Sequence, residues 1–285
     1  MQLGDFEITP LLDGHFRLDG GSMFGVVPRV LWEKKMPPDE RHRVRIAVRC
    51  LLVRNGNRTI LIDAGQGNKQ SEKFRDRFAV EQPLTLLDRL RNRGIRPEDI
   101  TDVINCHLHF DHAGWNTVRE KDRIVPAFPN ARYWSQRGEW DRSQHYATEK
   151  DQGSFLEEDF LPLEAPRWEL IEGEKPVVPG IEILPVPGHS LHTQGVLISA
   201  GEKKVAFLGD LMPTTHHVPY AWIAAFDLHP VESLATKRRI LPRAVREQWI
   251  CVFDHDPDVA AARLVEPSPG VLGVVPAEEF TDPAD

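Results

Sequence analysis

The chain has 285 residues, 41% hydrophobic and 27% charged, a balance typical of a soluble globular protein with a large core. Its net charge of −8 argues against a nucleic-acid partner, because surfaces that bind nucleic acids are normally basic. No segment approaches the roughly 18 apolar residues of a membrane span, and no basic region followed by an apolar core opens the chain. We therefore expect no membrane partner and no signal peptide, with the cytoplasm as the default location.

The first part of the chain combines a strand, an apolar loop and a hairpin. Residues 3–12 alternate around apolar side chains and predict a strand. Residues 14–38 predict an apolar loop, too rich in glycine for a helix, that either has a function or packs onto its own core. The turn residues Asn55-Gly56-Asn57 predict a hairpin between strands at 44–53 and 59–63.

Helices and strands alternate in the rest of the chain. The predicted elements are a helix at 85–93, strands at 100–105 and 131–134, a polar and weakly helical stretch at 137–159, strands at 168–171 and 181–186, a hairpin of 195–200 with 204–208, a helix at 231–246 that Pro242 divides, a strand at 248–253, and a last strand at 271–275 in a Pro-rich tail. This order predicts two β-sheets with helices outside them.

The segment 106–112 has the sequence Cys-His-Leu-His-Phe-Asp-His and places four metal-capable side chains within six residues, although the whole chain has only 12 histidines. Alternate residues of an extended segment point the same way, so His107, His109 and Asp111 are expected to face one pocket, with His112 beside them. Cys106 is expected to point away from that pocket. With Cys50 and Cys251 it forms an odd, widely spaced set, which predicts buried free thiols.

Polar residues follow three later strands as well. His189, Asp210 and His255 each come just after an apolar run, which is where α/β scaffolds commonly place functional side chains. With the cluster at 107–112 they make seven candidate ligands. Mixed histidine and carboxylate ligands suit zinc or a similar ion, and seven are enough for two ions.

These motifs resemble the metallo-β-lactamase superfamily of dinuclear hydrolases. The resemblance extends from about Leu3 to Pro257 and rests on the order and spacing of His-x-His-x-Asp-His at 107–112, Pro-Gly-His at 187–189, Phe-Leu-Gly-Asp at 207–210 and the late His255. It implies an α/β (α+β) fold, a four-layer αββα sandwich in one domain over residues 1–285, with the site at one edge between the sheets.

The resemblance also implies a role for each ligand. His107, His109 and His189 would bind one divalent ion, Asp111, His112 and His255 the other, and Asp210 would bridge them. Asp63 would orient a metal-binding histidine, although a plain turn-forming role at a strand end stays open. Zinc is expected, with iron, cobalt or manganese as alternatives.

The implied chemistry is attack by a metal-bridging hydroxide on the carbonyl of a lactone or ester, or on the phosphorus of a phosphotriester. Asp111 and Asp210 are the catalytic carboxylates, and Asp111 would pass a proton to the leaving group.

The chain is most similar to the acyl-homoserine lactonase and methyl-parathion-hydrolase group. That group uses its N-terminal loop for an apolar pocket and a dimer contact, so a small-molecule substrate is implied and a homodimer is an open option. Candidates for the pocket are Met23, Phe24, Trp32, His216, His217 and Tyr220. Relatives carry a glycine where this chain has His192, and many lactonases carry a tyrosine where it has Pro213.

Three alternatives stay open. A ribonuclease Z-like nuclease is disfavoured by the net charge and by the lack of an obvious basic patch. A β-lactam or thioester hydrolase is the second, although Asp210 as a bridging ligand separates the chain from true β-lactamases, which generally lack that carboxylate. A non-catalytic metal-binding protein is the third, and the complete ligand set argues against it.

Overall fold

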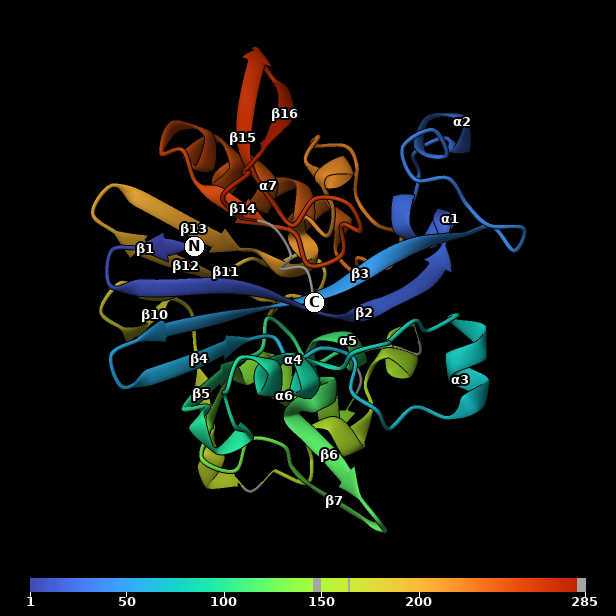
Figure 1. The fold of residues 1–285 in the computed structure, drawn as a ribbon. Helices are drawn as coiled ribbons and strands as arrows, with labels where there is room; N and C mark the ends of the chain where they lie inside the picture. Colours follow the sequence, from blue (N-terminus) through green and yellow to red (C-terminus); the bar gives the residue numbers. More distant parts are fainter. Residues whose placement is uncertain (146–149, 164, 281–285) are drawn as a thin grey trace.

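Two seven-stranded sheets lie face to face in the computed structural model, which describes residues 1–145, 150–163 and 165–280 (Figure 1). The first sheet has the order β1 (Gln2–Leu3), β2 (Phe6–Asp19), β3 (Arg43–Asn55), β4 (Arg58–Ile62), β5 (Asp102–Ile104), β8 (Arg132–Gln136) and β9 (Trp168–Ile171). The second has the order β10 (Lys175–Val178), β11 (Ile181–Pro185), β12 (Gln194–Ala200), β13 (Lys203–Phe207), β14 (Ile250–Val252), β15 (Ala261–Ser268) and β16 (Val271–Pro276). A separate hairpin of β6 (Thr117–Glu120) and β7 (Arg123–Pro126) projects at the bottom of Figure 1.

Alternation along the strands builds three apolar layers. Successive side chains of a strand point to opposite faces. In β4, Ile60 and Ile62 enter the core between the sheets, while Leu61 packs on the outer face. In β14, Ile250 and Val252 enter the same central core, while Cys251 faces outward.

Helices cover both outer faces. Helix α4 (Leu86–Asn92) places Leu86 and Leu90 against the first sheet, and α7 (Pro230–Arg246) packs on the second. The capping box of Thr85 and Asp88 fixes the start of α4. The remaining α-helices are α1 (Gly20–Phe24), α2 (Arg29–Trp32), α3 (Glu72–Arg77), α5 (Phe110–Ala113) and α6 (Arg137–His145). The predicted four-layer αββα architecture is confirmed.

Strand direction brings the candidate ligands to one edge. Strands β4 and β5 are parallel, as are β13 and β14, and β11 runs the same way as β13 because both are antiparallel to β12. The carboxyl ends of these strands therefore lead into the segments that carry the candidate ligands. The distant motifs meet because the strands that precede them within each sheet run in the same direction and end at the same edge.

The predicted loop at 14–38 is wrong in two respects, because a strand continues into its first part and the short helices α1 and α2 follow, although its glycine content predicts no helix. Strand β2 continues to Asp19 and pairs with β3 as far as Arg43. A bulge between Leu12 and Gly14 shifts the register, and this shift breaks the alternation by which the strand would have been recognised. Asp19 then caps α1 by accepting hydrogen bonds from the amides of Gly21 and Ser22.

The second half holds two more corrections. Pro242 does not divide α7, which runs unbroken because Ile240, Leu241 and Ala244 are buried around the proline and hold the helix on the sheet. The tail carries the antiparallel pair β15 and β16 rather than a single strand. Of the weakly helical stretch at 137–159, α6 covers the start, and residues 146–149 lie outside the described residues.

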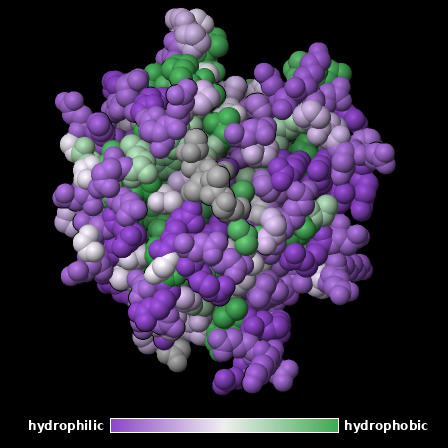
Figure 2. Space-filling model, viewed as in Figure 1, coloured by the Kyte–Doolittle hydropathy of each residue, from purple (hydrophilic) through white to green (hydrophobic). Residues whose placement is uncertain are grey.

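The face in Figure 2 is mostly hydrophilic, with apolar side chains in small separate groups. Among the described residues, no helix is long and apolar enough to cross a membrane. Cys50, Cys106 and Cys251 are buried and free, as predicted.

Candidate metal centre

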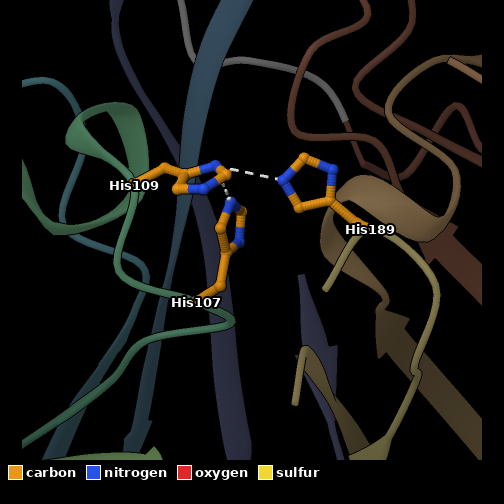
Figure 3. Close-up of side chains that lie close together, drawn as sticks. All are labelled: His107, His109 and His189. Atoms are coloured by element: carbon orange, nitrogen blue, oxygen red, sulfur yellow. Dashed lines mark hydrogen bonds between the residues drawn. The ribbon is translucent and has the colours of Figure 1, made fainter. Parts of the chain in front are cut away.

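Three histidines from two segments point at one another (Figure 3). His107 Nε2 and His189 Nε2 each lie 3.0 Å from His109 Nδ1. All three side chains are buried, and His107 and His109 follow β5 whereas His189 follows β11. We call His107, His109 and His189 the three-histidine group.

A second group lies beside the first and mixes histidines with carboxylates. His112 Nε2 lies 3.3 Å from His255 Nε2, and Asp210 Oδ1 lies 3.1 Å from His255 Nε2. Asp254 belongs to the same set, in which every ligand atom lies within 4.8 Å of the others. We call His112, Asp210, Asp254 and His255 the mixed group. Asp254 was missed by the sequence reasoning, although it directly precedes His255.

Asp210 faces both groups at once. Its Oδ2 lies 3.4 Å from His189 Nε2 and 3.9 Å from His107 Nε2. Its Oδ1 faces His255 and lies 3.6 Å from His112 Nε2. The two oxygens of one carboxylate therefore point to two different sets of imidazole nitrogens.

Asp111 lies slightly further out, at the start of α5. Its oxygens are 3.9 Å from His112 Nε2 and 3.7 Å from His255 Nε2, and the side chain is 11% exposed. It lines the cavity above the two groups. The structure thus brings together all seven residues that the sequence singled out as ligands.

Outer residues fix the orientation of the imidazoles. Asp63, at the end of β4, accepts hydrogen bonds from His112 Nδ1 at 2.7 Å and from the Cys106 amide at 2.7 Å. His255 Nδ1 donates to the Ala47 carbonyl at 2.8 Å. These contacts turn the Nε2 atom of each ring toward the mixed group.

Asp227 does the same for the three-histidine group, and the sequence reasoning did not find it. Its Oδ1 lies 3.2 Å from His189 Nδ1, and its Oδ2 accepts a hydrogen bond from Ser233 on α7. Asp227 lies in a loop far from any ligand motif, so only its position in space shows this contact.

The two groups differ in their electrostatics. Burial, reinforced by neighbouring imidazoles, holds the pKa of His107 and His109 well below the usual range, so their nitrogens are neutral. In the mixed group burial acts in the same direction, but the carboxylates of Asp254 and Asp210 outweigh it and raise the pKa of His255 to about 10. Burial raises the pKa of Asp254 to about 7. The mixed group thus places two carboxylates beside two imidazoles, a donor set that a divalent cation can join.

The donor set fits two metal ions. Zinc holds imidazole nitrogens at about 2.0–2.1 Å, which places neighbouring donors roughly 3 Å apart, as they are in the three-histidine group. A shared proton could link one pair of facing imidazole nitrogens. Here three imidazole nitrogens converge, and one proton cannot satisfy all of them. Asp210 Oδ1 and Asp254 Oδ2 are buried without a hydrogen-bond partner in the described residues. Both groups therefore suit cations.

An apolar cavity of about 390 Å³ opens above the two groups. Asp111, His109, His189, Asp210 and His255 lie at its base. Its walls carry the side chains of Phe16, Leu18, Met23, Ile46, Phe74, Phe78, Phe110 and Phe226. We call this set the apolar wall.

Of the six pocket candidates, Met23 lines the cavity and the other five do not. Phe24 is stacked between Trp32 and His217, at 5.4 and 5.1 Å between ring centroids. His217 Nε2 lies 2.8 Å from the Met23 carbonyl, so this stack supports the wall from behind. His216 and Tyr220 are partly buried in the loop that follows Asp210.

Four of the wall's phenylalanines come from three separate segments. Phe74 and Phe78, at α3, contact Phe110, which stands between His109 and Asp111. Phe16 on β2 contacts Phe78 and Phe110. The segment 71–78 reads as polar in sequence, which hides its two inward aromatic residues.

His192 and Pro213, the two departures noted in the sequence, lie outside the cavity lining. The ring of His192 packs on Gly138, where an added Cβ would lie 2.4 Å from it. The carbonyl of Pro213 accepts a hydrogen bond from the His255 amide at 2.9 Å. Among the described residues, the cavity lining contains no tyrosine.

The αββα fold and the two adjoining histidine and carboxylate groups define a protein with two candidate metal sites at the edge of a β-sandwich. A sequence model of the metallo-beta-lactamase superfamily matches residues 44–255. The chain belongs to this superfamily.

Several relatives are similar over most of the chain. An N-acyl homoserine lactonase of Bacillus cereus is 31% identical over 228 residues, which are 75% of this chain and 82% of the relative. The crystal structure of a probable metal-dependent hydrolase from Staphylococcus aureus has a TM-score of 0.89 at 29% identity and covers 99% of this chain and 100% of its own. The structure of the dizinc quorum-quenching lactonase AidC superimposes with a TM-score of 0.79 at 22% identity, over 98% of this chain and 96% of AidC. This match shows that the two proteins share a fold.

Proposed function

We propose that the protein is a hydrolase that holds two divalent metal ions, zinc in the first instance, and opens the ring of N-acyl homoserine lactones. The observation that carries this proposal is the position of Asp210, whose two oxygens face the two ligand groups at the base of an apolar cavity. The curated relative at 31% identity is an N-acyl homoserine lactonase, which supports the lactone as substrate.

The proposed reaction adds water to the lactone carbonyl and breaks the ring carbon–oxygen bond, which leaves a carboxylate and a hydroxyl group. Ions bound in the two groups would supply a water acidic enough to attack near neutral pH and positive charge to stabilise the developing oxyanion. His107, His109 and His189 would bind one ion, and Asp111, His112 and His255 the other. Asp210 would hold the two at a fixed separation.

The chain's own groups account for orientation and proton transfer. Asp63 and Asp227 each hold one imidazole so that its Nε2 faces inward. Asp111 lies at the cavity surface, where its carboxyl can give a proton to the departing ring oxygen. The apolar wall would bind the acyl chain and exclude water from the base.

A panel of substrates tests the proposal. The metal-loaded protein is assayed against homoserine lactones with short and long acyl chains, an aryl ester, paraoxon, nitrocefin and a structured RNA. We expect the long-chain lactones to give the highest kcat/KM. The aryl ester and paraoxon are included because five phenylalanines line the cavity. Absence of lactone hydrolysis by protein with two ions bound would overturn the assignment.

A further inference from the structure

Asp254 is a buried carboxylate that the proposed reaction does not use. It follows β14, is 2% exposed, and its Oδ1 accepts a hydrogen bond from the His255 amide at 3.1 Å. Its Oδ2 has no hydrogen-bond partner, and no lysine or arginine pairs with it, in the part of the chain that the structure describes. A buried carboxylate oxygen without a hydrogen bond is costly, so this oxygen points to a missing partner.

The open oxygen lies in the mixed group. Asp254 Oδ2 is 3.9 Å from His255 Nε2, the nitrogen that the Ala47 contact leaves free to bind a cation. Its ligand atom lies within 4.8 Å of those of His112 and Asp210. A Cβ on Gly209 would be 4.0 Å from Oδ2, so the backbone just before Asp210 also approaches this carboxylate.

The carboxylates are distributed unevenly between the two groups. The three-histidine group contributes three imidazoles, and Asp210 is the acid that reaches it. On the other side lie Asp111, Asp210 and Asp254 together with two histidines. Imidazole ligands suit zinc, whereas carboxylate oxygens favour harder ions such as Mn²⁺. The two sites should therefore differ in the ions that they prefer.

We propose that Asp254 is an additional carboxylate ligand of the ion in the mixed group, and that it shifts this group toward harder divalent ions relative to the three-histidine group. This inference rests on the two-ion site proposed above. It adds to that site a ligand that the sequence motifs do not contain.

Metal titration of Asp254→Asn tests the inference without turnover. The chelator-treated full-length chain is titrated with Zn²⁺ alone and with Mn²⁺ alone, and Asp258→Asn, which changes an exposed aspartate four residues further on, is the matched control. We expect the second equivalent to bind about tenfold or more weakly in Asp254→Asn, the first to be unchanged, and the loss to be larger for Mn²⁺. A second equivalent that binds as in the wild type, or an equal loss for both ions, would overturn the proposal.

Melting temperatures with and without metal separate this role from a structural one. Metal binding should raise the melting temperature less in Asp254→Asn than in the wild type, because the variant loses a ligand. A structural carboxylate would lower the melting temperature equally in both states, which would contradict the inference. Asp254→Glu keeps the charge and should bind the second equivalent more tightly than Asp254→Asn. Because no substrate is present, failure of the lactonase assignment would leave these results unaffected.

Discussion

The base and the wall of the cavity are built in opposite ways. The base consists of buried imidazoles and carboxylates that follow strands β5, β11, β13 and β14, and the rings of His112, His189 and His255 are each fixed by a hydrogen bond from behind. The wall consists of apolar side chains from β2, α1, β3, α3, α5 and the loop before α7, which pack against one another. In the proposed function, the base would therefore determine the reaction, and the wall would determine which substrate reaches it. Changes at the base should alter kcat and metal content, whereas changes at the wall should alter KM.

Removal of a ligand should have the largest effect. His109→Ala or Asp210→Ala should lower kcat/KM for the lactone by about a thousandfold or more, since the bound ions account for several kcal/mol of transition-state stabilisation. Metal content, measured by elemental analysis, should fall with it. His229→Ala changes an exposed histidine outside the site and should keep both properties. Wild-type rates with normal metal content in His109→Ala would refute the ligand assignment.

Loss of an orienting carboxylate should have a smaller effect. Asp227→Asn replaces the acceptor of His189 Nδ1 and should weaken metal binding by about 10–100-fold, as loss of such outer contacts usually does. Ser233→Ala removes only the hydroxyl behind Asp227 and should weaken it less. Titration of both chelator-treated variants with Zn²⁺ measures their metal affinities. A larger loss of affinity in Ser233→Ala than in Asp227→Asn would show that Asp227 does not act through His189.

The wall should respond through substrate length. Phe78→Ala opens the aromatic cluster with Phe16 and Phe110, and it should raise KM for a long-chain lactone about tenfold, roughly 1.4 kcal/mol of apolar contact. The short-chain lactone should be nearly unaffected, and kcat should stay close to the wild-type value. Val26→Ala is the control, because Val26 is apolar but 92% exposed. Equal loss on both substrates would place Phe78 in a general structural role.

Lys237 on α7 links the loop after Asp210 to the back of the wall, and its effect should be on stability. Its ammonium donates to the carbonyls of His217, Pro219 and Trp222, and burial lowers its pKa to about 7. Because this value lies below that of an unfolded lysine, the unfolded chain binds more protons between about pH 7 and 10.5. The contribution of Lys237 to stability is therefore present at high pH and lost as the pH falls through about 7.

Urea unfolding at pH 7 and pH 9 checks this sign. The wild type should gain stability over Lys237→Met as the pH rises, because the variant has no group that titrates there. The neighbouring Arg238→Met removes an exposed cation from the same helix and should leave the pH dependence intact. A constant difference between the wild type and Lys237→Met would contradict the titration of this lysine.

The sequence alone predicted the superfamily, the four-layer fold and the seven candidate ligands that the structure brings together. It could do so because His107, His109, Asp111 and His112 are local in sequence, and the other three ligands directly follow apolar strands whose pattern is strong. A metal motif combines ligand chemistry with short spacing, and both can be read from the chain.

Only the tertiary structure decided the rest. Asp227 and Asp254 became visible when separate segments met around the same imidazoles, and the apolar wall formed when Phe16, Phe74 and Phe78 from distant segments packed around Phe110. The sequence predicts Phe24, Trp32 and His217 as pocket residues, but they stack behind the wall instead. The physical reason is that packing and buried-charge compensation depend on which residues meet in space, whereas the ligand motif depends on neighbours along the chain.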